Sequence, residues 1–141
     1  MNSMLKNRLD RAFSLTMDLL LVLEENNLFL DLPNLPSNKV ADQFWCIVGA
    51  RESYINAIKS DGWQGFTCSL KAPINKDGIV KCFNITSELF CAIDFMNLTN
   101  NQLKFAFDLL EHEIQHHGQL IRYMYGNKLS FPISWNKRYT V

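Results

Sequence analysis

Residues 109–120 read Leu109-Leu-Glu-His-Glu-Ile-Gln-His-His-Gly-Gln-Leu120, and this stretch holds all three histidines of the chain. On a helix, Phe105, Leu109, Leu120 and Tyr123 fall within about 80° of His112, which predicts a helix with one buried face. His112 and His116 are four positions apart and therefore lie one above the other on that face. His117 points about 140° away from His112, because each residue turns a helix by about 100°. The stretch predicts a core helix that carries two imidazoles inward, where they can bind one divalent metal ion.

Outward from this stretch, the apolar periodicity predicts four helices. We expect them over residues 2–26, 37–59, 83–98 and 99–125. Thr99 and Gln102 match a capping box, which would begin the last helix.

The connections between these helices differ in length. Residues 61–80 show no clean period and are expected to form a long crossover between the second and third helices. Residues 131–135 are expected to be extended and to pack on the helices. The whole pattern predicts one all-α domain over residues 1–141, a four-helix bundle.

The composition argues against several classes of partner. The chain has 14 Lys and Arg residues and 14 Asp and Glu residues, so its net charge is zero. With no run of basic residues, we do not expect nucleic acid as a partner. The apolar run of residues 19–23 is too short to span a bilayer, and no signal peptide is recognisable, so we expect a cytoplasmic protein with no membrane partner. The four cysteines form no CxxC pair and are expected to be free thiols.

Residues 112–116 also match the HExxH motif of zinc metalloproteases, with Glu113 as the general base. Such enzymes need a third ligand further along the chain. After Glu113 the chain has no Asp or Glu, and its only histidines are His116 and His117. In the extended motif Gly118 would be one position early, and Arg122 stands where the last histidine belongs. We therefore interpret this match as coincidental.

Three stretches of the chain resemble the DinB family of small metalloenzymes. Residues 112–120 resemble the HxxxH[R]GQ signature of the family's last helix, with His117 where arginine is common. Residues 43–54 are similar to the family's second helix, which supplies a third histidine ligand. Residues 132–135, Pro-Ile-Ser-Trp, are like the proline and tryptophan of the family's tail.

The resemblance implies a fold and a chemistry. The fold is a four-helix bundle of up-up-down-down course with a long crossover between helices two and three. The chemistry is that of a metal-dependent transferase, isomerase or hydrolase, with zinc or nickel held by three histidines and open positions for a small-molecule substrate. The resemblance also implies that this substrate is a low-molecular-weight thiol and that the protein is a homodimer.

Cys46 stands at the position of the third histidine in this resemblance. A site formed by His112, His116 and Cys46 is chemically sound for zinc, since a thiolate is a good zinc ligand. Such a site is softer than one of three histidines and favours zinc over nickel. Alternatively, Cys46 is a small buried apolar residue. The chain would then be a non-catalytic bundle with a degenerate metal site, acting as a binding or oligomerisation module.

Other side chains are expected around the two histidines. Gln119 and Tyr123 lie on the histidine face, where Gln119 could hold an imidazole N–H or a bound water, and Gln43 lies beside Cys46. Glu113 is about 100° round the helix from His112 and is expected to make a surface contact or to touch a ligand from outside.

The sequence allows two roles for each of two arginines. Arg51 and Arg122 can bind the acidic groups of a substrate, or they can lie on a solvated or salt-bridged face.

Overall fold

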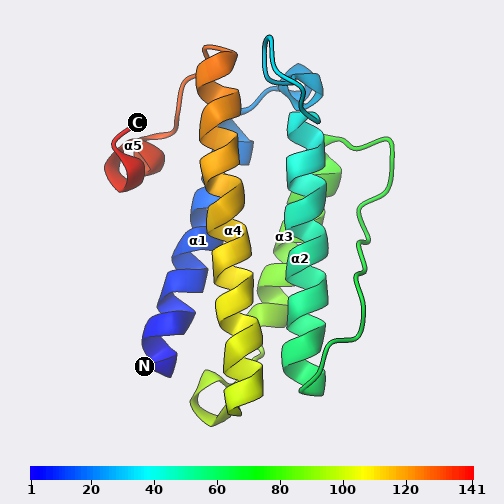
Figure 1. Ribbon diagram of the computed structural model, residues 1–141, viewed down its shortest axis with the longest axis vertical. Helices are drawn as coiled ribbons and strands as arrows, with labels where there is room; N and C mark the ends of the chain where they lie inside the picture. Colours follow the sequence, from blue (N-terminus) through cyan, green and yellow to red (C-terminus); the bar gives the residue numbers. More distant parts are fainter.

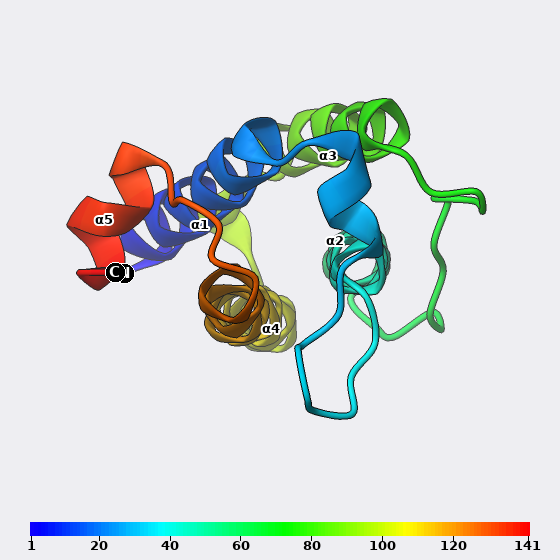
Figure 2. The same ribbon diagram turned by 90° about the horizontal axis from the view of Figure 1, so that it is seen from above.

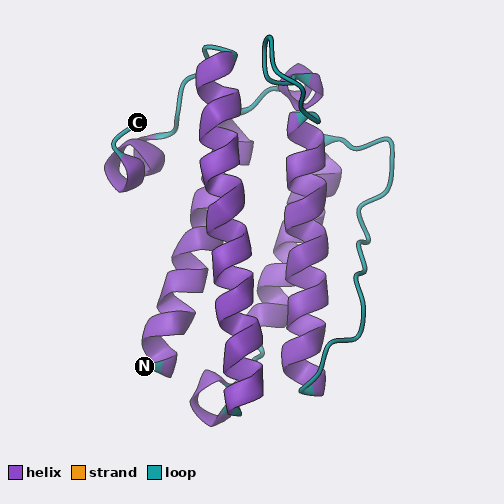
Figure 3. Cartoon of the chain, viewed as in Figure 1, coloured by secondary structure: helices purple, strands orange, loops and turns teal.

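The computed structural model describes residues 1–141 and contains helices and loops but no strand (Figures 1 and 3). The prediction of an all-α protein is confirmed. The α-helices are α1 (Asn2–Val22), α2 (Val40–Ser60), α3 (Lys76–Cys91), α4 (Asn100–Gly126) and α5 (Ile133–Tyr139), with the short 3-10 helices η1 (Glu25–Phe29) and η2 (Phe95–Asn97). No helix is both long enough and apolar enough to cross a membrane.

The four long helices lie side by side in a closed arrangement. Seen from above, α1 and α2 each lie between α3 and α4, and contacts join each of these neighbouring pairs (Figure 2). The short α5 packs against α1.

The course of the chain differs from the one implied by the family resemblance. Helices α1 and α4 run upward in Figure 1 and α2 and α3 run downward, so the order is up-down-down-up rather than up-up-down-down. The connection between α1 and α2 lies at one end of the molecule, so α2 runs antiparallel to α1 (Figure 1). Within this connection the N–H of Val40 donates to the carbonyl of Leu30 at 2.9 Å.

The long crossover lies where it was predicted, between α2 and α3. Its residues 61–75 run along the outside of the molecule beside α2 (Figure 1). An extended chain of this length reaches roughly 50 Å. The 21 residues of α2 rise about 32 Å, so the crossover is long enough to let α3 run parallel to α2.

The predicted starts of α1 and α4 match the structure to within one residue, whereas the predicted start of α3 does not. Thr99 caps α4, and its side chain accepts from the N–H of Gln102, as predicted. Helix α3 begins seven residues earlier than predicted, at Lys76 rather than residue 83. Its cap is Asn75, whose side chain accepts from the N–H of Gly78 at 2.8 Å. Gly78, which lies within the predicted crossover of residues 61–80, is instead in the first turn of the helix.

The C-terminal segment is helical, not extended. Pro132 precedes α5, which is compatible with proline's fixed φ and missing N–H. Trp135 is completely buried, and its indole N–H donates to the carbonyl of Leu15 at 2.6 Å. A seven-residue helix is too short to be stable alone, so this packing is what holds it.

A polar layer divides the apolar interior into two clusters. One cluster includes Leu5, Leu9, Ile55 and Leu109, and the other includes Leu19, Leu20, Val48 and Leu120. Between them lie four fully or almost fully buried polar side chains, those of Thr16, Arg51, Glu113 and His117.

Candidate metal centre

His112 and His116 meet at their Nε2 atoms. These two atoms are 3.1 Å apart, and the imidazole centroids are 4.7 Å apart. His116 is buried and His112 is half-buried. Both side chains face α2: His116 contacts Gln43, and the ring of His112 lies 6.4 Å from that of Tyr54.

Gln43 determines which nitrogen of His116 carries the proton. Its Oε1 lies 2.7 Å from Nδ1 of His116, and because Oε1 can only accept, Nδ1 carries the hydrogen. The Nε2 atom of a neutral His116 is then unprotonated and directed at His112. Gln43 is itself oriented by Asn38, whose Oδ1 accepts from Nε2 of Gln43 at 2.9 Å and from the hydroxyl of Tyr123 at 2.5 Å.

Both imidazoles are neutral at pH 7. Burial, with a smaller contribution from His112, lowers the pKa of His116 to about 4. Burial also lowers the pKa of His112, although the negative charge of Glu113 works in the opposite direction. Metal ligation requires neutral imidazole, so this environment leaves the nitrogen lone pairs available.

The separation of the two nitrogens fits one metal ion. Two nitrogens that bind a tetrahedral zinc at about 2.0–2.1 Å lie about 3.3 Å from each other. The observed 3.1 Å is close to this value. No group of three or more His, Cys, Asp or Glu side chains lies close enough together to hold a metal. The structure thus joins His112 and His116 but does not gather Cys46 with them. Cys46 is half-buried, and burial together with the charge of Asp42 raises the pKa of its thiol.

A hollow of about 280 Å³ opens beside Gln43. It is lined by residues that include Asn38, Gln119, Arg122 and Tyr123. Gln119 and Arg122 are exposed. The ion pairs of the protein are Lys6–Asp10 and Arg51–Glu113, so Arg122 has no acidic partner. Of the three side chains expected around the histidines, Gln43 contacts His116 directly, Tyr123 acts on Gln43 through Asn38, and Gln119 lines the hollow.

Glu113 and Arg51 lie in the core, which corrects the prediction of a surface contact for Glu113. Arg51 forms a salt bridge, one of the interpretations left open for it, but this salt bridge is buried and not on an exposed face. Both side chains are almost completely inaccessible. Oε1 of Glu113 accepts from Nη2 of Arg51 and from the hydroxyl of Thr16, each at 2.5 Å, and Oε2 accepts from Nε of Arg51 at 3.2 Å. Burial acts to raise the pKa of Glu113, but the charge and hydrogen bonds of Arg51 outweigh it and hold the pKa below its usual value.

His117 belongs to this buried layer and points away from the histidine pair, as the helical geometry predicts. Its Nε2 lies 2.7 Å from the Thr16 hydroxyl, and its Nδ1 lies 2.7 Å from the Tyr139 hydroxyl. Since Thr16 gives its hydrogen to Glu113, Nε2–H of His117 donates to Thr16, and Tyr139 donates to Nδ1. Burial lowers the pKa of His117 to about 4, so the ring is neutral. His117 links α4 to both α1 and α5.

One signal in the sequence marks Arg51 as buried. Phe44, Ile47, Ile55 and Ile58 recur along α2 at helical steps, and Arg51 occupies the middle of this stripe. A charged residue at such a position requires a buried partner of opposite charge. No local pattern identifies that partner as Glu113, because it comes from another helix, 62 positions along the chain.

Comparisons with known proteins do not place the chain in a family. No protein-family model matches it, and no curated protein is similar to it. The resemblance to the DinB family therefore stays a prediction, and the assignment of a function depends on the geometry of the two histidines.

Proposed function

We propose that His112 and His116 bind one divalent metal ion, zinc or nickel, and that the protein is a metal-dependent enzyme of the DinB-like type. Its reaction would be a thiol-linked transfer, isomerisation or hydrolysis. The observation that carries this proposal is the pair of neutral imidazoles whose Nε2 atoms are 3.1 Å apart. The bound metal would act as a Lewis acid that lowers the pKa of a water or thiol.

The residues behind the histidines keep this pair ready to bind. Gln43 accepts from Nδ1 of His116 and so keeps the Nε2 lone pair free. Asn38 fixes the amide of Gln43, and the hydroxyl of Tyr123 fixes Asn38. Partners of this kind orient ligands and raise their basicity, and losing one typically weakens metal binding about 10- to 100-fold.

Cys46 is the side chain that we propose as the third ligand. It is three residues beyond Gln43 on α2, which is less than one helical turn. Its raised thiol pKa implies that the proton stays on sulfur until a metal displaces it. Reorientation of this side chain would then complete a site with two nitrogens and one sulfur, which favours zinc.

The hollow beside Gln43 could bind a small anionic substrate. Arg122 lines it, is exposed, and has no acidic partner in the protein. An arginine in this state can bind a carboxylate through two parallel hydrogen bonds. A low-molecular-weight thiol that also carries a carboxylate would place its charge on Arg122 and its sulfur toward the metal. The homodimer implied by the resemblance remains part of this proposal.

Cobalt(II) substitution tests the ligand set. Cobalt(II) accepts the same nitrogen and sulfur ligands as zinc, and a thiolate ligand adds a charge-transfer band in the near ultraviolet. We expect that band in the parent protein and its loss in Cys46→Ser, with cobalt still bound through the histidines. The Cys68→Ser variant is the matched control and should keep the band. If the parent and Cys46→Ser give the same spectrum, Cys46 is not a ligand.

A specific observation favours the alternative of a non-catalytic bundle. At 3.1 Å the two Nε2 atoms can share one hydrogen, with Nε2–H of His112 donating to His116, and the pair is then satisfied without a metal. The chain would then serve as a binding or oligomerisation module. Cys46→His separates the two proposals: if only this variant takes up nickel and the parent takes up no metal, the parent site is degenerate.

A further inference from the structure

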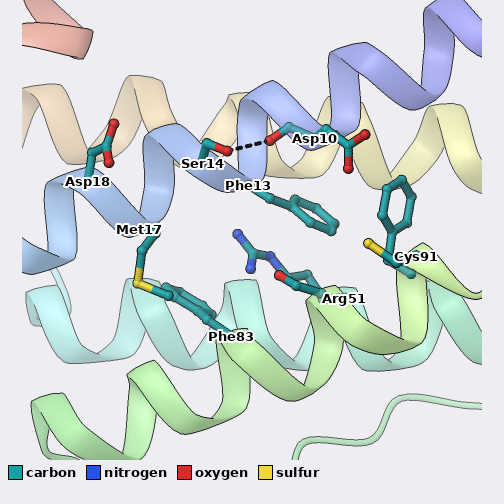
Figure 4. A pocket seen from close by; sticks show the side chains of 10 residues that line it. Asp10, Phe13, Ser14, Met17, Asp18, Arg51, Phe83 and Cys91 are labelled. Carbon is teal, nitrogen blue, oxygen red and sulfur yellow. Dashed lines mark hydrogen bonds between the residues drawn. The ribbon is translucent and has the colours of Figure 1, made fainter.

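A second cavity lies between α1 and α3, and Arg51 of the polar layer is part of its lining (Figure 4). Its volume is about 490 Å³, which is enough for a small organic ligand. The side chains of Phe13, Met17 and Phe83 form apolar walls, and Arg51 reaches in from α2 (Figure 4). Phe90 of α3 also lines the cavity. None of the residues that line it belongs to the candidate metal centre.

One nitrogen of Arg51 has no partner in the protein. Nε and Nη2 donate to Glu113, whereas Nη1 donates to no protein atom. No completely buried side-chain nitrogen or oxygen lacks a partner, so Nη1 is not sealed in the core but reaches the cavity. The whole residue is only 1% exposed. Nη1 can therefore donate to an acceptor from outside the chain, either water or a ligand that displaces it.

The two faces of the guanidinium are already covered. The ring centroid of Phe13 lies 3.9 Å from Cζ of Arg51, and that of Phe83 lies 4.3 Å from it (Figure 4). A ligand can therefore reach Arg51 only at its edge, through Nη1. The rest of such a ligand would lie against aromatic rings, which favours an apolar or aromatic body.

The charges around the cavity determine which acceptor fits. Glu113 already neutralises Arg51, so a carboxylate would gain little from the guanidinium. Asp10 and Asp18 also line the cavity. Asp10 is paired with Lys6, but Asp18 has no cationic partner and accepts only from the hydroxyl of Ser134. The unpaired charge of Asp18 repels an anion and attracts a cation.

From these observations we propose that this cavity binds a small aromatic amine that also carries an uncharged carbonyl group. The carbonyl oxygen accepts from Nη1 of Arg51, the aromatic body lies among Phe13, Phe83 and Phe90, and the ammonium group pairs with Asp18. The proposal is independent of any metal at His112 and His116, because no residue is shared between the two sites.

Phenylalanine amide and 3-phenylpropionate are the probes that test this assignment. Both have the same aromatic body, but the first has an ammonium and an uncharged amide and the second has a carboxylate. Calorimetric titration of the full chain should show saturable binding of the amide and weaker binding of the carboxylate. Asp18→Asn should weaken the amide about fivefold, the effect of one partly exposed ion pair. Asp31→Asn, at an exposed loop position, should leave binding unchanged.

A variant that fills the cavity shows where the amide binds. Ser87 lines the cavity from α3, and Ser87→Phe should abolish binding of the amide while circular dichroism shows an intact helical fold. Ser14→Phe, on the opposite wall, serves the same purpose if Ser87→Phe does not fold. The proposal is overturned if the amide does not bind, if the carboxylate binds as tightly as the amide, or if a folded cavity-filling variant binds like the parent.

Discussion

Gln43 accepts a hydrogen bond from Nδ1 of His116 at 2.7 Å, and this contact leaves Nε2 of His116 free to face His112. The two residues come from different helices, α2 and α4, which run in opposite directions and pack closely. Which nitrogen of His116 carries the proton therefore depends on how α2 packs against α4. Both histidines lie on α4, so a metal would join the two helices only if the proposed ligand Cys46 on α2 also bound it.

Replacing Gln43 should weaken the metal centre without unfolding the protein. Gln43→Leu removes the acceptor for Nδ1 of His116, so the proton can move to Nε2 and compete with the metal. We expect zinc affinity to fall about 10- to 100-fold in a chelator competition assay. Gln119→Leu is the matched control, because Gln119 lines the same hollow but makes no hydrogen bond to His116. Equal affinities in the parent and in Gln43→Leu would show that this hydrogen bond has no role in binding.

Breaking the buried ion pair should cost far more stability than breaking a surface pair. Glu113→Gln leaves the charge of Arg51 buried without a counter-ion, and we expect the free energy of unfolding in urea to fall by about 3–5 kcal/mol. Lys6→Ala breaks the half-exposed pair with Asp10 and should cost less than about 1 kcal/mol.

A double variant separates the cost of an unpaired charge from the worth of the pair. Combining Arg51→Met with Glu113→Leu removes both charges and should restore most of the stability lost in Glu113→Gln. If the double variant is as unstable as the single one, the pair contributes more than mutual neutralisation.

Stability should fall as the pH falls below the ordinary histidine value of 6.5. The pKa of His117 is about 4 in the folded protein, so the unfolded chain binds more protons in this range and gains stability relative to the fold. The loss begins near pH 6.5 and reaches about 2 kcal/mol for one histidine at about pH 5. His116 adds a similar loss, because its pKa is also about 4.

Urea unfolding of metal-free protein at about pH 7.5 and about pH 5 measures this dependence. In His117→Gln, the free energy of unfolding should fall between these pH values only by the amount due to His116 and His112. Glu113 remains charged over this range because its pKa lies below the usual value of 4.5. A parent protein that is equally stable at both pH values would contradict neutral, buried histidines.

The C-terminal helix should depend on a single tryptophan. Trp135→Ala removes a completely buried side chain and its hydrogen bond to Leu15, and we expect a loss of about 3–5 kcal/mol. The same change at Trp63, which is half exposed and lies on the crossover, should cost much less. Thermal unfolding of the two variants compares them. Similar losses would mean that α5 is not anchored as described.

The sequence alone predicts the part of the candidate site that depends on spacing within one helix. His112 and His116 lie on one face because they are four apart, and His117 lies off that face for the same reason. The packing of α2 against α4 determines which residue of α2 contacts these histidines. The spacing of residues within one helix does not specify that packing. Gln43 was therefore expected near the pair, but its contact with His116 comes only from the structure.

The same distinction explains the corrected elements of the fold. Helix α3 was predicted to begin late because Asp77 and Gly78 are turn residues in most contexts, whereas here they follow the cap Asn75. Helix α5 was missed because seven residues carry too little periodic signal and because Trp135 stabilises it through contacts with α1. Glu113 was expected at the surface because it lies about 100° round the helix from His112, and its buried partner Arg51 lies on a different helix.

Metal content by elemental analysis, on protein purified without a histidine tag, is the measurement to make first. The parent should contain one zinc or nickel ion per chain, His116→Ala should contain none, and the neighbouring His117→Gln should retain it. A parent without metal even after incubation with zinc, or with the same content as His116→Ala, would contradict a metal centre at His112 and His116.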